Sequence, residues 1–185
     1  MDFIAQIHAS STMAVVVVTG GGAQAVADLL AVPGASKTVL EALVPYSERA
    51  LTEFLGKKPV QAVSGQTAAA MARAAYQRAL WLRAKPTIPI VGVSCTATLV
   101  TDRPKKGEHR AHVGLCTEEA ARVYSLSLTK GARDRAGEER IVSNLLLKTL
   151  AEACRVPFFL ELELLSHEHL EVQEMSPALN KGGNP

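Results

Sequence analysis

The feature that most constrains the fold is an apolar, β-branched run that breaks into three consecutive glycines. Residues 14–18 indicate a buried strand, residues 20–22 a tight turn, and residues 23–30 the start of an amphipathic helix. Glycine tolerates positive φ and lets a ligand approach the backbone, and a helix N-terminus presents unpaired N–H groups. The stretch therefore predicts a strand–turn–helix unit that suits an anion, although a plain connecting turn fits the same residues.

Length and composition limit the classes of protein to which the chain can belong. A chain of 185 residues is long enough for one sizeable core, so we expect a single domain over residues 1–185. A net charge of +2 gives no field that would indicate nucleic acid or a membrane as partner, and 4% aromatic residues argue against a base-stacking surface. Three widely spaced cysteines, no metal-ligand pattern and no apolar run of membrane-spanning length favour a cytoplasmic protein without a metal.

Further along the chain, helix and strand patterns alternate. Ser36, Ser47 and Ser64 each occupy an expected N-cap position, which predicts one helix after Ser36, a second ending near residue 55 and a third reaching about residue 83. The later patterns predict, in order, a strand over 86–93, a small-residue loop over 94–98, a β-hairpin formed by 109–116 and 122–129, and a helix carrying the apolar face 141–150.

Two small-residue loops are thus expected at the carboxyl ends of strands, one after Val18 and one after Val93. In open α/β sheets, ligands bind in crevices outside such strand ends. We therefore expect the two loops to form the walls of one crevice. A single α/β layer structure with a mixed sheet accounts for all of these patterns.

Several segments, in this order, resemble the carboxy-terminal domain of the CinA (competence-damage-inducible) family, which includes the nicotinamide mononucleotide deamidases. The segments are Thr-Gly-Gly at 19–21, Val-Pro-Gly-Ala-Ser at 32–36, Val-Pro-Tyr-Ser at 44–47, Leu-Gly at 55–56, Val-Ser at 63–64 and Met-Ala at 71–72. The resemblance runs from about residue 15 to 140, residues 104–110 fit a divergent branch, and residues 157–185 form a C-terminal extension.

The resemblance implies a three-layer α/β/α sandwich that hydrolyses the carboxamide of a nicotinamide nucleotide to the acid and ammonia, without metal or cofactor. In such members a serine and a lysine, helped by a tyrosine and an arginine, form the site. Carried over by motif position, the catalytic residues are Ser36, Tyr46 and Arg133, and the substrate-binding residues are Thr19, Gly20, Gly21, Ser94 and Thr96. The lysine position holds Leu51, and Ala132 stands where the family often has an aspartate before the arginine.

Leu51 leaves two functions open. A serine needs a base to take its proton, and losing that base costs roughly 10²–10⁴ in rate, so Lys37, Lys57 or a histidine would have to lie within about 3 Å of Ser36. With such a base, we expect a nicotinamide mononucleotide amidohydrolase. Without it, we expect a non-catalytic nucleotide-binding or assembly protein. Both functions imply a phosphorylated nucleotide and a homo-oligomer as partners, and residues 161–165 could serve as an edge strand in self-association.

Overall fold

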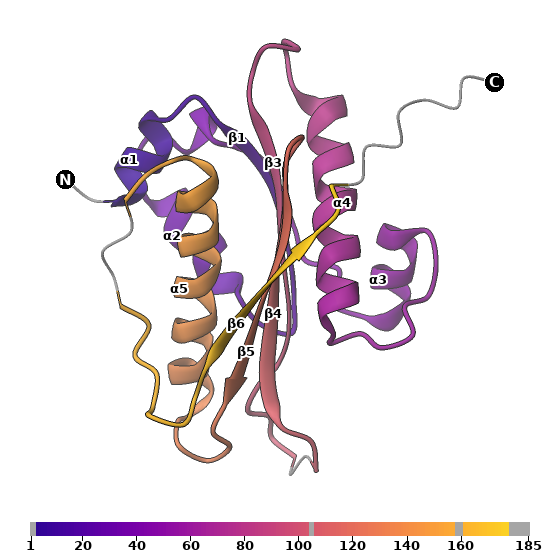
Figure 1. Cartoon of the computed structure of the whole chain (residues 1–185), viewed down its shortest axis with the longest axis vertical. Helices are drawn as coiled ribbons and strands as arrows, with labels where there is room; N and C mark the ends of the chain where they lie inside the picture. Colours follow the sequence, from indigo (N-terminus) through magenta and orange to yellow (C-terminus); the bar gives the residue numbers. More distant parts are fainter. Residues whose placement is uncertain (1–2, 104–105, 158–160, 178–185) are drawn as a thin grey trace.

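A six-stranded mixed sheet, covered by helices on both faces, organises the molecule (Figure 1). The computed structural model describes residues 3–103, 106–157 and 161–177, so two residues of the divergent segment 104–110 lie outside the described chain. Helices α1 (Phe3–Ala9), α2 (Ala23–Ala31) and α5 (Arg135–Ala153) cover one face, and α3 (Glu48–Leu55) and α4 (Gly65–Leu82) cover the other. The predicted three-layer α/β/α sandwich is confirmed.

The strand order is β2-β1-β3-β4-β5-β6. Strands β1 (Met13–Thr19), β2 (Val39–Leu43) and β3 (Ile90–Thr98) are parallel, whereas β4 (His109–Cys116), β5 (Ala121–Leu128) and β6 (Leu170–Met175) continue the sheet antiparallel. The predicted hairpin is β4 and β5. The first strand along the chain thus lies inside the sheet and the last forms an edge.

Strand β1 is apolar on both sides because both sides are covered. Val16 and Val18 join the core beneath α2 and α5, while Val15 and Val17 join the core beneath α3 and α4. A continuous β-branched run is typical of a parallel strand buried on both faces. The predicted strand–turn–helix unit is therefore confirmed as β1 and α2.

Helix α4 packs unusually close to the sheet. A Cβ atom on Gly92 would lie 2.2 Å from the carbonyl oxygen of Ala72, and one on Gly114 would lie 2.5 Å from that of Ala68. The alanines of α4 and these two strand glycines therefore let helix and sheet backbones meet directly, as the Ala-rich apolar face of this helix leads one to expect.

Two local predictions are wrong. The segment after Ser36 is not a helix: a short 3₁₀ turn (Ala35–Lys37) leads into β2, which pairs with β1. The few apolar residues of this segment fit both the helical period and the strand period. The segment forms a strand because it pairs with the buried β1. Residues 94–98 are not a loop either, because β3 continues to Thr98 with its hydroxyl residues on the α4 side.

Both ends of the chain contribute elements that the patterns did not predict. Helix α1 packs against α5 and the Ala35–Lys37 turn. In the C-terminal extension, residues 161–165 form no strand, whereas Leu170–Met175 pairs with β5 as β6. The extension therefore completes the sheet that the preceding residues begin.

Candidate functional site

A crevice of about 490 Å³ lies at the carboxyl ends of β1 and β2. The connection after β1 leads to α2 on one face of the sheet, and the connection after β2 leads to α3 on the other (Figure 1). Diverging connections of this kind open a crevice at the sheet edge, where α/β proteins bind ligands. The crevice is lined by Val18, Thr19, Gly20, Gly21, Ala23, Gln24, Ala27, Val44, Tyr46, Arg135, Ala136 and Glu139.

The glycine turn forms the floor of the crevice and requires glycine. Gly20 and Gly22 have φ values of +75° and +89°, in the left-handed region that disfavours other residues. A Cβ atom on Gly20 would lie 1.9 Å from the carbonyl oxygen of Ala97, and one on Gly22 would lie 3.2 Å from Cys95 Sγ. The turn therefore lies directly on β3.

The N-terminus of α2 already holds an anion, and that anion is a side chain of the protein. The backbone N–H of Gln24 donates to Glu139 Oε1 at 3.1 Å, and Ser143 Oγ lies 3.2 Å from the same oxygen. The carboxylate satisfies an orphan N–H and complements the positive end of the helix dipole. An external anion is thus not needed at this terminus.

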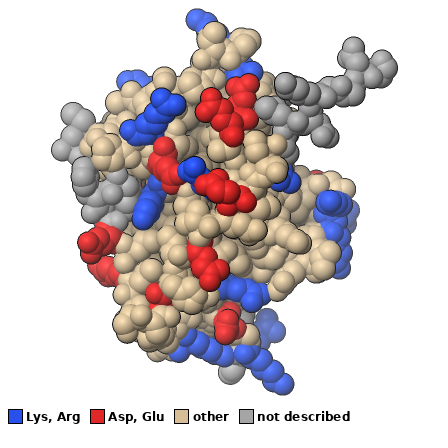
Figure 2. Space-filling model, in the orientation of Figure 1, with Lys and Arg blue, Asp and Glu red and all other residues tan. Residues whose placement is uncertain are grey.

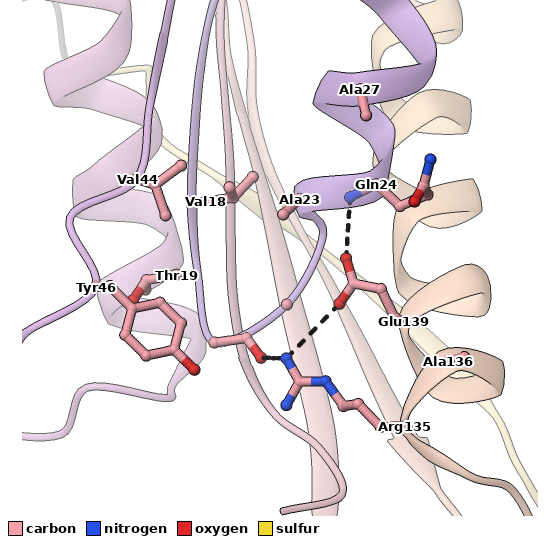
Figure 3. A pocket seen from close by; sticks show the side chains of 12 residues that line it. Val18, Thr19, Ala23, Gln24, Ala27, Val44, Tyr46, Arg135, Ala136 and Glu139 are labelled. Atoms are coloured by element: carbon pink, nitrogen blue, oxygen red, sulfur yellow. Dashed lines mark hydrogen bonds and ion pairs between the residues drawn. The ribbon is translucent and has the colours of Figure 1, made fainter.

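The cationic group of the crevice is Arg135, in the first turn of α5 (Figure 3). Its Nη2 donates to the carbonyl oxygen of Gly20 at 3.0 Å and its Nη1 to that of Val100 at 3.1 Å. Glu139 Oε2 lies 3.9 Å from Nη2, and the arginine side chain is 42% exposed. The guanidinium therefore fixes the glycine turn from one side and faces solvent on the other.

A buried carboxylate in the same turn of α5 holds the neighbouring strands. Glu138 is fully buried; its Oε1 lies 2.6 Å from His109 Nδ1, and its Oε2 accepts the N–H of Val100 at 2.8 Å. Glu138 and Arg135 together engage both backbone groups of Val100. The start of α5 is thus rigidly joined to the sheet beside the crevice.

Four of the predicted site residues lie together in this crevice. Thr19, Gly20 and Gly21 come from the end of β1 and the glycine turn, and Tyr46 comes from the segment after β2. The tyrosine is 68% exposed and lies at the rim of the crevice, across from Arg135 and Glu139 (Figure 3).

Ser36 lies elsewhere. It precedes β2, and the β1–β2 register sets Val39 beside Ala14, near the beginning of β1, whereas the crevice begins at Val18. At about 3.3 Å per residue, the length of β1 keeps the exposed Ser36 roughly 15 Å from the crevice. The nearby His8 is engaged at both ring nitrogens, by Thr38 Oγ1 at 3.0 Å and by the Leu29 carbonyl at 2.9 Å.

Arg133 does not line the crevice either. Its guanidinium binds both carboxylate oxygens of Glu168, at 2.6 and 2.8 Å, and the carbonyl oxygen of Glu163 at 2.8 Å. Burial would raise the pKa of Glu168, but hydrogen bonds from Arg133 and from the N–H groups of Thr129 and Leu165 outweigh it and lower that pKa to about 2. Arg133 thereby ties the C-terminal extension to the start of α5.

The ion pair of Arg133 with Glu168 borders a second cavity, of about 590 Å³. This cavity lies at the same end of the strands as the crevice. It is formed by the start of β4, the end of β5 and the turn before β6, and its lining includes Lys106, Lys130, His167 and Glu168.

Ser94 and Thr96 are fully buried on the α4 side of β3. Their hydroxyl groups donate to the carbonyl oxygens of Ala68 and Ala62, both at 2.7 Å. Neighbouring residues of β3 with the opposite orientation, Cys95 and Ala97, contact the glycine turn instead. Strand β3 therefore supports the glycine turn, but none of its residues lines the crevice to which the sequence predicted it would contribute.

The only carboxylate among the described residues that line the crevice is that of Glu139. Among the described residues that line it there is no serine, cysteine, histidine or lysine. Leu51 is buried in the apolar core under α4, while Lys37 and Lys57 are exposed and lie outside the crevice lining. No cluster of three or more His, Cys, Asp or Glu side chains suited to a metal occurs in residues 3–103, 106–157 or 161–177.

The motif comparison missed the two charged residues of the crevice, Arg135 and Glu139. The resemblance implies an arginine preceded by aspartate, and Asp134–Arg135 is such a pair two positions beyond Arg133. Asp134 is the N-cap of α5 and accepts the N–H of Gly137 at 2.7 Å. The Asp–Arg spacing was therefore a usable signal for Arg135, whereas nothing local in the sequence indicated that Glu139 would reach α2.

The face shown in Figure 2 gives little indication of a large charged partner. On the face shown in Figure 2, acidic and basic side chains are interspersed over the middle and upper parts, and basic ones gather at the lower end. Within the described part of the chain, none of the helices combines the length and apolarity needed to cross a bilayer.

Similar folds occur among solved structures. The competence/damage inducible protein CihA from Agrobacterium tumefaciens is 18% identical, with a TM-score of 0.64 over 82% of this chain and 93% of its own. A competence or damage-inducible protein from Enterobacter asburiae is 16% identical, with a TM-score of 0.60 over 83% and 92%. A CinA superfamily protein from Escherichia coli is 18% identical, with a TM-score of 0.53 over 81% and 83%.

No curated protein sequence matches the chain. The family model of the CinA C-terminal domain matches residues 5–139, which extend from α1 to the crevice residue Glu139. The match contains the glycine turn, Tyr46 and Arg135, and it ends before β6. The chain therefore belongs to the CinA C-terminal domain family.

Proposed function

We propose that this CinA-family chain binds a small phosphorylated nucleotide in the crevice and does not hydrolyse it. The observation that carries the proposal is the composition of the crevice: an exposed arginine and a glycine turn, without a serine, cysteine, histidine or lysine among its described lining residues. Such a site can hold an anion but lacks the serine–lysine pair that the resemblance implies. Thr19, Tyr46 and Glu139 also line the crevice, and Glu139 Oε1 is already engaged at the start of α2.

Three features support a nucleotide as the ligand. The crevice volume of about 490 Å³ falls in the range of small-molecule sites. Arg135 presents a partly exposed guanidinium, which favours phosphate, and the Tyr46 ring at the rim offers a face for a base. Glu139 neutralises the α2 terminus, so the phosphate is expected beside Arg135 and the glycine turn.

The position of Ser36, exposed and outside the crevice lining, supports binding over amide hydrolysis. A serine without general-base assistance loses roughly 10²–10⁴ in rate, which is about 3–5 kcal/mol of barrier. Ser36 is exposed at the opposite end of β1, and both ring nitrogens of His8 are engaged. Nicotinamide mononucleotide is therefore a candidate ligand rather than a substrate.

Thermal unfolding with and without ligand tests the binding. Nicotinamide mononucleotide and adenosine monophosphate are compared with nicotinamide riboside and adenosine, which lack the phosphate. A ligand at a hundred times its Kd stabilises the folded state by about 2.7 kcal/mol, so the phosphorylated member of at least one pair should raise Tm more than its nucleoside. Equal midpoints for all four compounds would contradict nucleotide binding.

Ammonia and nicotinate mononucleotide release tests the absence of hydrolysis. Purified protein and its Ser36→Ala variant are incubated with nicotinamide mononucleotide, and both are expected to release no more than the buffer. Release by the native chain that Ser36→Ala abolishes would establish the amidohydrolase and overturn binding without hydrolysis. The homo-oligomer stays a prediction, for which light scattering after size exclusion is the direct measurement.

A further inference from the structure

The sheet face under α4 carries a second group of polar side chains, separate from the crevice. Thr96, His112 and Ser125 lie opposite one another in the register of β3, β4 and β5. The hydroxyl group of Thr96 donates a hydrogen bond to the carbonyl oxygen of Ala62. His112 and Ser125 instead bind each other, with 2.8 Å between the histidine Nδ1 and the serine Oγ.

The pair is accessible and α4 begins above it. Both His112 and Ser125 are only half-buried, and within the described chain neither side chain has another hydrogen-bond partner. A Cβ atom on Gly65, the first residue of α4, would lie 4.0 Å from both the Nδ1 and the Oγ atoms. Glycine at this position keeps a side chain off the pair, because a Cβ atom there would be in van der Waals contact with both atoms.

The surroundings of the pair favour an uncharged histidine and place positive groups beside it, while Glu171 of β6 lies opposite Ser125. Burial lowers the pKa of His112, and the guanidinium of Arg110 lowers it further. Arg110 Nη2 donates to the carbonyl oxygen of Val63 at 3.3 Å, whereas its buried Nε has no hydrogen-bond partner among the described residues. The positive end of the α4 dipole lies at the same place, behind the N-cap Ser64.

We propose that Ser125 and His112 form a second site, a nucleophile and its base, which hydrolyses small carboxylic esters. Ser125 Oγ attacks the ester carbonyl carbon while its proton passes to His112 Nδ1, and Arg110 with the α4 terminus stabilises the oxyanion. The carbon–oxygen bond then breaks, and the alcohol leaves with the proton from His112. Water attacks the acyl-serine, gives a proton through His112 to Oγ, and releases the acid.

Labelling with an alkyl fluorophosphonate tests the nucleophile directly. The serine oxygen replaces fluoride on phosphorus, so peptide mass spectrometry identifies the modified residue in the folded native chain. We expect the adduct on Ser125. Ser127 is the internal control, because it is also half-buried, lies two positions further on the same strand and face, and has Arg110 rather than a histidine opposite it.

The base is tested by variants. His112→Gln should slow labelling of Ser125 by about a hundredfold or more, since general-base assistance is worth roughly 10²–10⁴. Ser125→Ala should abolish p-nitrophenyl acetate hydrolysis, Ser127→Ala should retain it, and Ser125→Cys should restore acyl-enzyme formation. Unfolding midpoints identify any variant that does not fold. Equal labelling of Ser125 and Ser127 in the native chain, or unchanged labelling in folded His112→Gln, overturns the proposal.

Discussion

The regions around Arg133 and Arg135 lie two positions apart at the start of α5 and differ in how their charges are used. Arg133 has a side chain only 15% exposed, and it is paired with a carboxylate, Glu168, that is 1% exposed. Arg135 is 42% exposed and hydrogen-bonds two backbone carbonyl oxygens, with its nearest carboxylate at 3.9 Å. The charge of Arg133 is neutralised by a carboxylate of the protein itself, whereas the charge of Arg135 remains able to attract a ligand in the crevice.

This difference teaches that the presence of an arginine near a site is less informative than the groups to which the arginine is bound. A cation saturated by a buried carboxylate stabilises the fold, and removing one partner leaves an uncompensated buried charge. A partly exposed cation bound to neutral carbonyl oxygens can still attract an anionic ligand. We therefore expect the Arg133 region to govern stability and the Arg135 region to govern binding.

The largest expected effect is on the Arg133 region. Glu168→Ala should lower the free energy of unfolding by about 3–5 kcal/mol, because the buried guanidinium of Arg133 loses its partner. Urea denaturation followed by circular dichroism measures the loss. Arg140→Ala is the matched control: its ion pair with Asp28 is 3.4 Å long and more exposed, so the loss should stay below about 1 kcal/mol. An equal loss of unfolding free energy in the two variants would show that the ion pair of Glu168 does not stabilise the fold more than an exposed ion pair does.

A smaller effect is expected from acid. The pKa of Glu168 is lowered to about 2 from its ordinary value of 4.5, so the stability it contributes is present above pH 4.5 and is lost as pH falls toward 2. Between pH 6 and pH 3 the native chain should lose about 2 kcal/mol more than Glu168→Ala, in urea titrations at each pH. Parallel pH profiles for the two proteins would contradict the ion pair.

The smallest expected effect is on the Arg135 region. Arg135→Gln should weaken binding of the phosphorylated ligand at least tenfold, which is about 1.4 kcal/mol, because a hydrogen bond to a charged group is lost. Isothermal titration calorimetry measures the change. Arg140→Gln, on the same helix and outside the crevice lining, should bind as the native chain does. A ligand that binds both variants equally does not use Arg135.

Much of the fold could be predicted from the sequence because its strongest signals are local. The β-branched run with its glycine turn, the caps at Ser47 and Ser64 and the alternating hairpin strands all form as predicted. Strand β2 could not be predicted, because five residues after a turn fit helix and strand equally and the pairing with β1 is not local. Helix α1 and strand β6 depend on tertiary contacts in the same way.

The site could be predicted in part. Thr19 and Tyr46 line the same crevice because they lie at the carboxyl ends of the parallel strands β1 and β2. The resemblance to the family had predicted both residues for the site. Ser36 could not be placed, because its position depends on whether the following residues are helix or strand. The role of Glu139 follows from packing of α5 against α2, across a separation of 115 residues from Gln24. Local patterns carry no information about such a contact.

Strand β6 has a consequence for the integrity of the chain. A protein truncated before residue 161 would leave β5 as a bare edge, with backbone N–H and C=O groups open to pairing with another molecule. In the intact chain the exposed edge is a short strand of six residues that carries Glu171 and Glu174, and charges on an edge strand discourage such pairing. The C-terminal extension thus acts as a protective cover, and proteolytic loss of it is a route to aggregation.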